Sequence, residues 1–137
     1  MRKRAMYLSI AVLLLIIGGA VTAGAAAPQF KKLAAPRLVS PCKGVILPHD
    51  VGYEIHFEWE SVPGASGYII NVEQAEIFSR NWIAWVSYWG FGLVHSTSID
   101  HYIPDQGYFR WRVFADNAAN ELQPSKYCYF TIAGSAM

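Results

Sequence analysis

The sequence lacks the residue patterns that accompany most enzyme chemistry. It contains no G-x-S-x-G nucleophile motif, no glycine-rich phosphate loop and no N-x-S/T glycosylation sequon. Its four histidines do not stand at metal-ligand spacing from a cysteine or from one another, and they are His49, His56, His95 and His101. Because no base, nucleophile or metal set is visible, we expect a chain that is not an enzyme and that carries no cofactor or metal.

The sequence also lacks a basic patch. Of its 11 Lys and Arg residues, three (Arg2, Lys3 and Arg4) lie at the extreme N-terminus, which leaves 8 against 10 Asp and Glu. Nucleic-acid binding requires clustered positive charge, so we expect no nucleic-acid partner. Three carboxylates, Glu54, Glu58 and Glu60, share one strand face, but such spacing is ordinary on the wet face of a sheet and is a weak indication of a cation site.

Long apolar runs are confined to the N-terminus. The basic start precedes an apolar run over residues 6–17, and small residues with A-x-A sites follow up to Ala27. This pattern predicts a secretory signal peptide over residues 1–25 and a secreted or extracytoplasmic protein, in the periplasm or at the cell surface. The alternative is an uncleaved anchor, since residues 6–27 are just long enough to span a bilayer, and only then would the membrane be a partner.

Cysteine is scarce, with Cys42 and Cys128 as the only two. An even count in an exported chain indicates a disulfide bond. The alternative is a pair of buried free thiols. A bond between them would join the beginning of the folded region to its end.

The rest of the chain is organised around residues 53–73. In the first part Tyr53, Ile55, Phe57 and Trp59 alternate with polar residues, which is typical of a strand with one dry and one wet face. Pro63, Gly64 and Gly67 then predict a turn, and Tyr68, Ile70 and Val72 predict a second strand with the same alternation.

Further short strands are predicted at residues 38–39, 97–103, 108–115 and 127–132, with loops over residues 42–52 and 116–125. Residues 77–91 fit two structures. As a helix they form one aromatic stripe, and as a strand they divide their aromatic residues between two faces. Their Trp, Tyr, Ile and Val content favours the strand.

Together these segments predict an all-β fold, a seven-stranded antiparallel β-sandwich of the immunoglobulin-like kind, after an N-terminal signal helix. We expect a linker over residues 26–35 and one domain over residues 36–134.

Three stretches resemble a fibronectin type III domain of the kind found in exported microbial proteins. They are PRLVSPCKG (36–44), FEWESVPGASGYIINV (57–72) and IPDQGYFRWRVFADNAANE (103–121). Trp59 and Tyr68 match the tryptophan and tyrosine of the second and third strands of that family, and Ile103, Val113, Ala115 and Asn117 match its corner and following strand. The corner tyrosine is replaced by Phe109, Pro104 lies one place early, and residues 77–91 match nothing specific.

The resemblance implies a sandwich fold with a structural or binding role, and it implies no catalytic residues. We therefore expect an exported module for protein interaction or structural support, and alternatively a carbohydrate-binding module. Exposed aromatic residues usually mark a contact surface, and Trp and Tyr suit either a protein or a polysaccharide partner. The candidate binding residues are Trp82, Trp85, Tyr88, Trp89 and Phe91.

Overall fold

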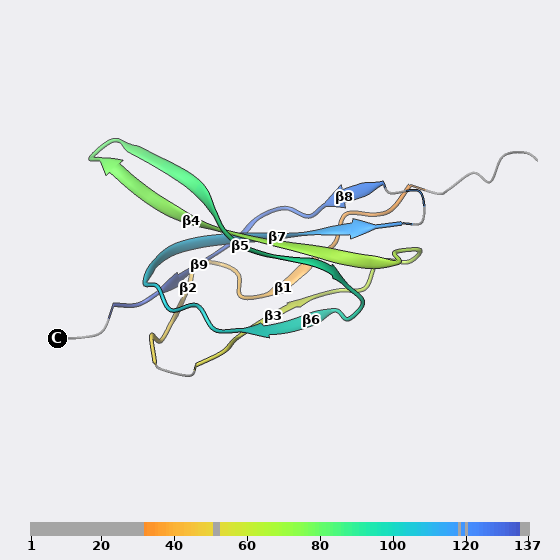
Figure 1. Cartoon of the computed structure of the whole chain (residues 1–137), viewed down its shortest axis with the longest axis horizontal. Coiled ribbons are helices and arrows are strands. Elements are labelled where there is room, and N and C mark those ends of the chain that lie inside the picture. The colour runs from red at the N-terminus through yellow and green to blue at the C-terminus, as the bar shows by residue number, and fades with distance from the viewer. Residues whose placement is uncertain (1–31, 51–52, 118, 120, 135–137) are drawn as a thin grey trace, which may run out of the picture. The chain divides into compact units, whose positions relative to one another are not determined.

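The computed structural model describes residues 32–50, 53–117, 119 and 121–134, and these form nine β-strands in two sheets (Figure 1). The predicted signal peptide lies outside the described residues. Within the described part of the chain, no helix is long and apolar enough to cross a membrane. The all-β prediction is therefore confirmed for the described part.

The smaller sheet contains three antiparallel strands in the order β1-β3-β6, namely β1 (Leu38–Ser40), β3 (Ile55–Trp59) and β6 (Ser98–His101). β1 ends just before Pro41. It lies at the edge of this sheet, and the proline that follows it, which has no backbone N–H to donate, suits an edge position.

The larger sheet has the order β2-β9-β7-β4-β5, with a short additional strand beside β7. Its strands are β2 (Val45–Leu47), β9 (Cys128–Ile132), β7 (Gly107–Asp116), β4 (Gly67–Ser79), β5 (Trp82–Val94) and the additional β8 (Leu122–Pro124). All pairs are antiparallel except β2 with β9, which is parallel.

The expected count of seven strands is not confirmed. β2 falls in the predicted loop 42–52, and β8 falls in the predicted turn 116–125. Each is only three residues long, which is too short to show a period-2 pattern in the sequence. Residues 77–91 are extended and not helical, but they are not one strand: β4 continues to Ser79, the chain turns, and β5 starts at Trp82.

The core lies between the two sheets. Along β3 the burial strictly alternates, with Ile55, Phe57 and Trp59 inside, as predicted from the sequence. The aromatic rings of the two sheets meet edge to face, with 5.0 Å between the ring centroids of Phe57 and Trp111 and 5.6 Å between those of Trp59 and Tyr68. Burial of this single apolar face is what holds the sheets together.

Two residues, Leu33 and Tyr53, differ from the sequence-based prediction in their burial. Leu33, which falls within the predicted linker 26–35, is buried in the core. Its Cδ2 lies 3.4 Å from the position that a Cβ would take at Gly64. Tyr53, predicted to share the dry face of β3, instead lies outside that strand and is exposed.

Cys42 and Cys128 form a disulfide, as predicted, with their Cα atoms 4.8 Å apart and a separation of 86 residues in the sequence. Cys128 pairs in register with Trp111 of β7, so the bond lies beside the aromatic core. Immediately before Cys42, the Pro41 carbonyl accepts a hydrogen bond of 2.6 Å from the Trp111 indole N–H. The bond and this contact together fix the segment through which the chain passes from β1 in one sheet to β2 in the other.

We predict that Trp59→Ala lowers the free energy of unfolding by about 3–5 kcal/mol, because it removes a buried ring and leaves a cavity. Chemical denaturation measures the change. Glu58→Ala, at the exposed neighbouring position of β3, is the control and should change stability by no more than about 0.5 kcal/mol. A Trp59→Ala variant as stable as the wild type would contradict the core assignment.

We further predict that the double variant Cys42→Ser, Cys128→Ser loses about 4 kcal/mol of stability, since the bond closes a long loop and so restricts the unfolded chain. Wild-type protein unfolded in the presence of a reductant should show the same loss. Equal stability of the oxidised and reduced chains would show that loop closure contributes nothing here.

Candidate functional site

The β4–β5 hairpin extends beyond the strands that support it. β4 pairs with β7 only from Gly67 to Gln74, whereas its pairing with β5 continues to Ser79. Among the described strands, the last five residues of β4 therefore pair with β5 alone. Figure 1 shows this end of the hairpin projecting past the rest of the sheet. A two-stranded ribbon has little stability of its own, so packing against something else would stabilise it.

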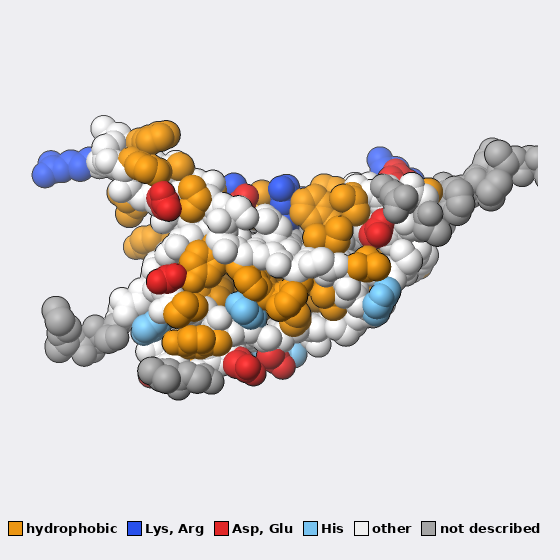
Figure 2. All heavy atoms as spheres, viewed as in Figure 1, with side chains coloured by type: hydrophobic (Ala, Val, Ile, Leu, Met, Phe, Trp, Pro, Cys, Tyr) orange, Lys and Arg blue, Asp and Glu red, His pale blue; other side chains and the backbone are white. Residues whose placement is uncertain are grey.

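The end of this ribbon is apolar and exposed. We use the name hairpin tip for four side chains that are each 55–63% exposed: Ile77, Phe78, Trp82 and Ile83. The rings of Phe78 and Trp82 lie against each other, with centroids 4.7 Å apart. Figure 2 shows hydrophobic side chains at the projecting end of the hairpin. Contiguous exposed apolar groups of this kind mark a contact surface.

Next to the tip, Trp85 lies on the outer face of the larger sheet. Its ring meets Tyr129 of β9 edge to face at 5.7 Å. The guanidinium of Arg110 lies over the Trp85 ring at 4.5 Å and over the Tyr127 ring at 4.1 Å. Arg112 continues this stack between Tyr127 and Phe114. Cation–π contacts of this kind hold flat side chains in fixed orientations.

Glu73 anchors the stack from β4. It accepts a hydrogen bond from Nε of Arg110, its register partner on β7. The two side chains are only 15% and 20% exposed. Burial lowers the pKa of Arg110, but the hydrogen bonds from Arg110 to Glu73 and Tyr129, and the Glu73 charge, outweigh it and raise that pKa overall. Burial, and then the Glu73 charge, raises the pKa of Tyr127. The arginine therefore stays charged while it supports Trp85.

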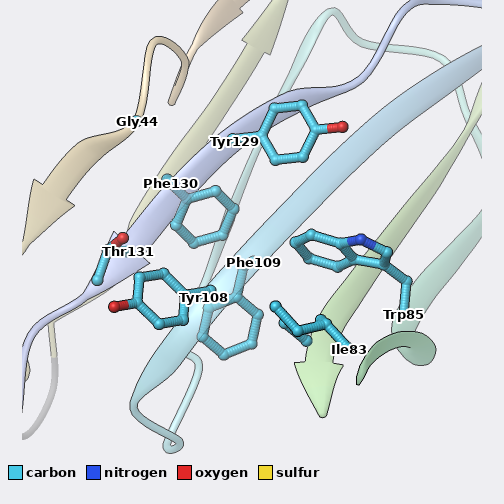
Figure 3. Close-up of a pocket in the computed structure, with 9 residues that line it drawn as sticks. Gly44, Ile83, Trp85, Tyr108, Phe109, Tyr129, Phe130 and Thr131 are labelled. Carbon is cyan, nitrogen blue, oxygen red and sulfur yellow. The ribbon is translucent and has the colours of Figure 1, made fainter. Parts of the chain in front are cut away.

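An apolar pocket of about 330 Å³ opens beside Trp85 on this outer face. Its walls come from four strands and one loop residue, and Figure 3 shows the rings of Trp85, Tyr108 and Tyr129 around it. The lining residues are Gly44, Ala75, Ile83, Trp85, Tyr108, Phe109, Tyr129, Phe130 and Thr131. The pocket shares Ile83 with the hairpin tip, so the two adjoin each other on this side of the ribbon.

Tyr88 departs from strand alternation. The register passes from Trp89 opposite Val72 to Ser87 opposite Glu73, which leaves Tyr88 as an extra residue in β5. Such a bulge re-aims a side chain. The Tyr88 ring meets the buried Phe109 edge to face at 5.4 Å, and its hydroxyl donates a hydrogen bond of 2.5 Å to Asp105. Tyr88 is therefore half-buried against the core, whereas Trp82 is exposed at the hairpin tip.

Trp89 and Phe91 also face the space between the sheets. The Trp89 ring stacks on His101 of β6 at 3.8 Å and lies 6.1 Å from Phe57. Phe91 meets the Trp89 ring edge to face at 4.1 Å. Burial lowers the pKa of His101, opposed by the charge of Glu54. These contacts give Trp89 and Phe91 a role in closing one side of the core.

The structure thus divides the five predicted binding residues. Trp82 lies at the tip and Trp85 at the pocket, whereas Tyr88, Trp89 and Phe91 are half-buried against the core. Sequence reasoning missed Tyr108 and Tyr129, which come from β7 and β9. Their signal was present, since both alternate with buried residues and so belong to the wet face of their strands.

The histidines each have a structural contact. Nitrogen atoms of His49 and His95 lie 2.6 Å and 2.9 Å from the backbone carbonyls of Pro104 and Ser66. His56 Nδ1 lies 2.5 Å from an Asp100 carboxylate oxygen on the exposed face of the smaller sheet. Within the residues that the structure describes, no group of three or more His, Cys, Asp or Glu side chains is arranged to hold a metal ion.

Comparison with known proteins bears on the fold. No family model matches the chain, and no curated protein matches its sequence. Among solved structures, the solution structure of the fibronectin type III domain of human fibronectin type III domain containing protein 3 matches with 14% identity and a TM-score of 0.43, over 83% of this chain and 94% of that one. The fold is similar to a fibronectin type III domain. This likeness says nothing about ligands.

The Tyr88 contact gives a pH prediction. Burial, together with the hydrogen bond to Asp105, raises the pKa of Tyr88 to about 12, whereas an unfolded tyrosine titrates near 10. The stabilisation is therefore complete below about pH 10 and is lost as the pH rises through about 12. We expect the free energy of unfolding of Tyr88→Phe, measured by chemical denaturation at a series of pH values, to fall less steeply over this pH window than that of the wild type. Identical slopes would show that Tyr88 ionises as freely in the native state as in the unfolded state.

Proposed function

We propose that this chain is an exported, non-catalytic module that binds another protein through the hairpin tip and the adjoining pocket. The observation that carries the proposal is the exposure of Ile77, Phe78, Trp82 and Ile83 on a ribbon that projects past its own sheet. Side chains of this type form the anchors of protein interfaces when they are buried by a partner. Export is supported by the leader-like N-terminus and by the disulfide, which persists in oxidising compartments.

The outer-face stack suits this role because it fixes the pocket wall in advance. Trp85 lies between the Arg110 guanidinium and Tyr129, so little side-chain freedom remains to be lost on binding. The pocket walls are almost wholly apolar. An apolar side chain of a partner would fill such a pocket with favourable burial, while the tip packs against the partner's surface.

A carbohydrate partner is the second candidate, and one observation favours it. Trp85, Tyr108 and Tyr129 present three aromatic rings around one depression (Figure 3). Aromatic rings with a hydrogen-bonding edge suit sugars, which have apolar faces and hydroxyl rims. The hairpin tip is not expected to contact a carbohydrate, so variants of the tip distinguish a protein partner from a carbohydrate partner.

We predict that the double variant Phe78→Ser, Trp82→Ser keeps the stability of the wild type to within about 0.5 kcal/mol, because both side chains are exposed. It should lose binding to a protein partner that the wild-type chain captures from the native source. The matched control is Val39→Ser, Leu122→Ser, which removes two exposed apolar side chains away from the hairpin.

Retention on polysaccharide columns is measured with the same proteins and with Trp85→Ser. Loss of polysaccharide retention in Trp85→Ser, with no protein captured by the wild type, would support the carbohydrate candidate. A tip variant that captures its protein partner as well as the control does would contradict the proposal.

A further inference from the structure

β5 is the free edge of the larger sheet. It follows β4 at the end of the order β2-β9-β7-β4-β5, and no other described strand pairs with its far side. It has 13 residues, on the order of 40 Å at about 3.3 Å per residue. One row of backbone N–H and C=O groups along this length is therefore available to another strand.

The edge strands of the described fold differ in how they are protected. β1 and β2 have three residues each, and β6 has four and carries Asp100. Short length and charge are the usual means by which sheet edges avoid pairing with other chains. β5 is long, and its sequence WIAWVSYWGFGLV contains no charged residue and no proline, although bulges at Tyr88 and at Gly92 divide its edge into shorter regular stretches. Of these four edges, β5 is the one suited to strand addition.

Gly92 lies at an irregular point of this edge. The register passes from Phe91 opposite Ile70 to Val94 opposite Tyr68, so β5 has an extra residue there and Gly92 lies in a bulge. A Cβ at Gly92 would meet nothing within 4 Å, so a side chain fits at this edge position without a clash inside the chain.

We propose that β5 joins two copies of this chain, each adding its β5 antiparallel to that of the other and so continuing the larger sheet. This inference rests on the proposed function, since it names a partner for the same hairpin. Trp82 and Ile83 begin the strand and Leu93 lies near its end, and all three are at least half exposed. Antiparallel pairing brings the Trp82 end of one copy to the Leu93 end of the other, and covers both ends at once.

Charge also favours a second copy. A two-fold axis places identical surfaces against each other, so any charged edge would meet its own sign. β5 is uncharged, and the formal net charge of the chain is only +1. The self-repulsion that keeps highly charged proteins apart is therefore small.

The test is the self-association of the full chain, measured by sedimentation equilibrium over a concentration series. The wild type should form dimers, and Gly92→Lys should raise the dimer dissociation constant at least about tenfold, because it places a charge on the edge without a clash inside the chain. The control is Ile46→Lys, which adds the same charge at an exposed position of β2, on the opposite edge of the same sheet. It should dimerise like the wild type.

Thermal unfolding establishes that each variant is folded, and Ser87→Lys, at an exposed β5 position, replaces Gly92→Lys if that variant does not fold. A wild type that stays monomeric, or equal weakening by Gly92→Lys and Ile46→Lys, would overturn the dimer. A monomeric wild type that still captures a protein through the tip would overturn the dimer alone. The β5 variants could weaken the dimer while the wild type captures no other protein and still binds polysaccharide. That result would support the dimer and would reject a different protein as the partner.

Discussion

The fold depends on the burial of Trp111. This side chain is fully buried in β7, meets Phe57 and Trp59 of the opposite sheet edge to face, and donates its indole N–H to the Pro41 carbonyl. Its register partner Cys128 forms the disulfide to Cys42. Trp111 therefore contacts both sheets, the segment that crosses between them and a residue of the disulfide. Because these contacts hold the centre of the sandwich together, strands farther from Trp111 can carry exposed binding residues.

The larger sheet has two faces with different physical roles. Its inner face is apolar and meets the smaller sheet, whereas its outer face carries a stack of arginines and aromatic rings anchored by Glu73. The stack needs no partner to be ordered, because the ion pair and the cation–π contacts are made within the sheet. Its effect is to present Trp85 and Tyr129 as a fixed wall beside the projecting hairpin.

The hairpin itself belongs to two regions. Near the sandwich, Tyr88, Trp89 and Phe91 cover one side of the core, and the bulge at Tyr88 allows two successive aromatic residues to do so. Beyond the last residue that β4 pairs with β7, these two strands pair only with each other among the described strands, and the apolar side chains at their end are exposed. An element that is structural at its base and exposed at its end is well placed to bind, because the base holds the end in position.

The sequence by itself determined the all-β class, the dry faces of β3 and β4 and the pairing of the two cysteines, because period-2 alternation and an even cysteine count can be read without the fold. It did not determine β2 or β8, which are too short to alternate, or the buried place of Leu33. Strand alternation alone divides the five predicted binding residues between two faces, but it does not show the extra residue at Tyr88, which lets Tyr88 and Trp89 both face the core. The pocket was decided by tertiary structure alone, since its walls are far apart in the sequence and meet only when β4, β5, β7 and β9 pair side by side.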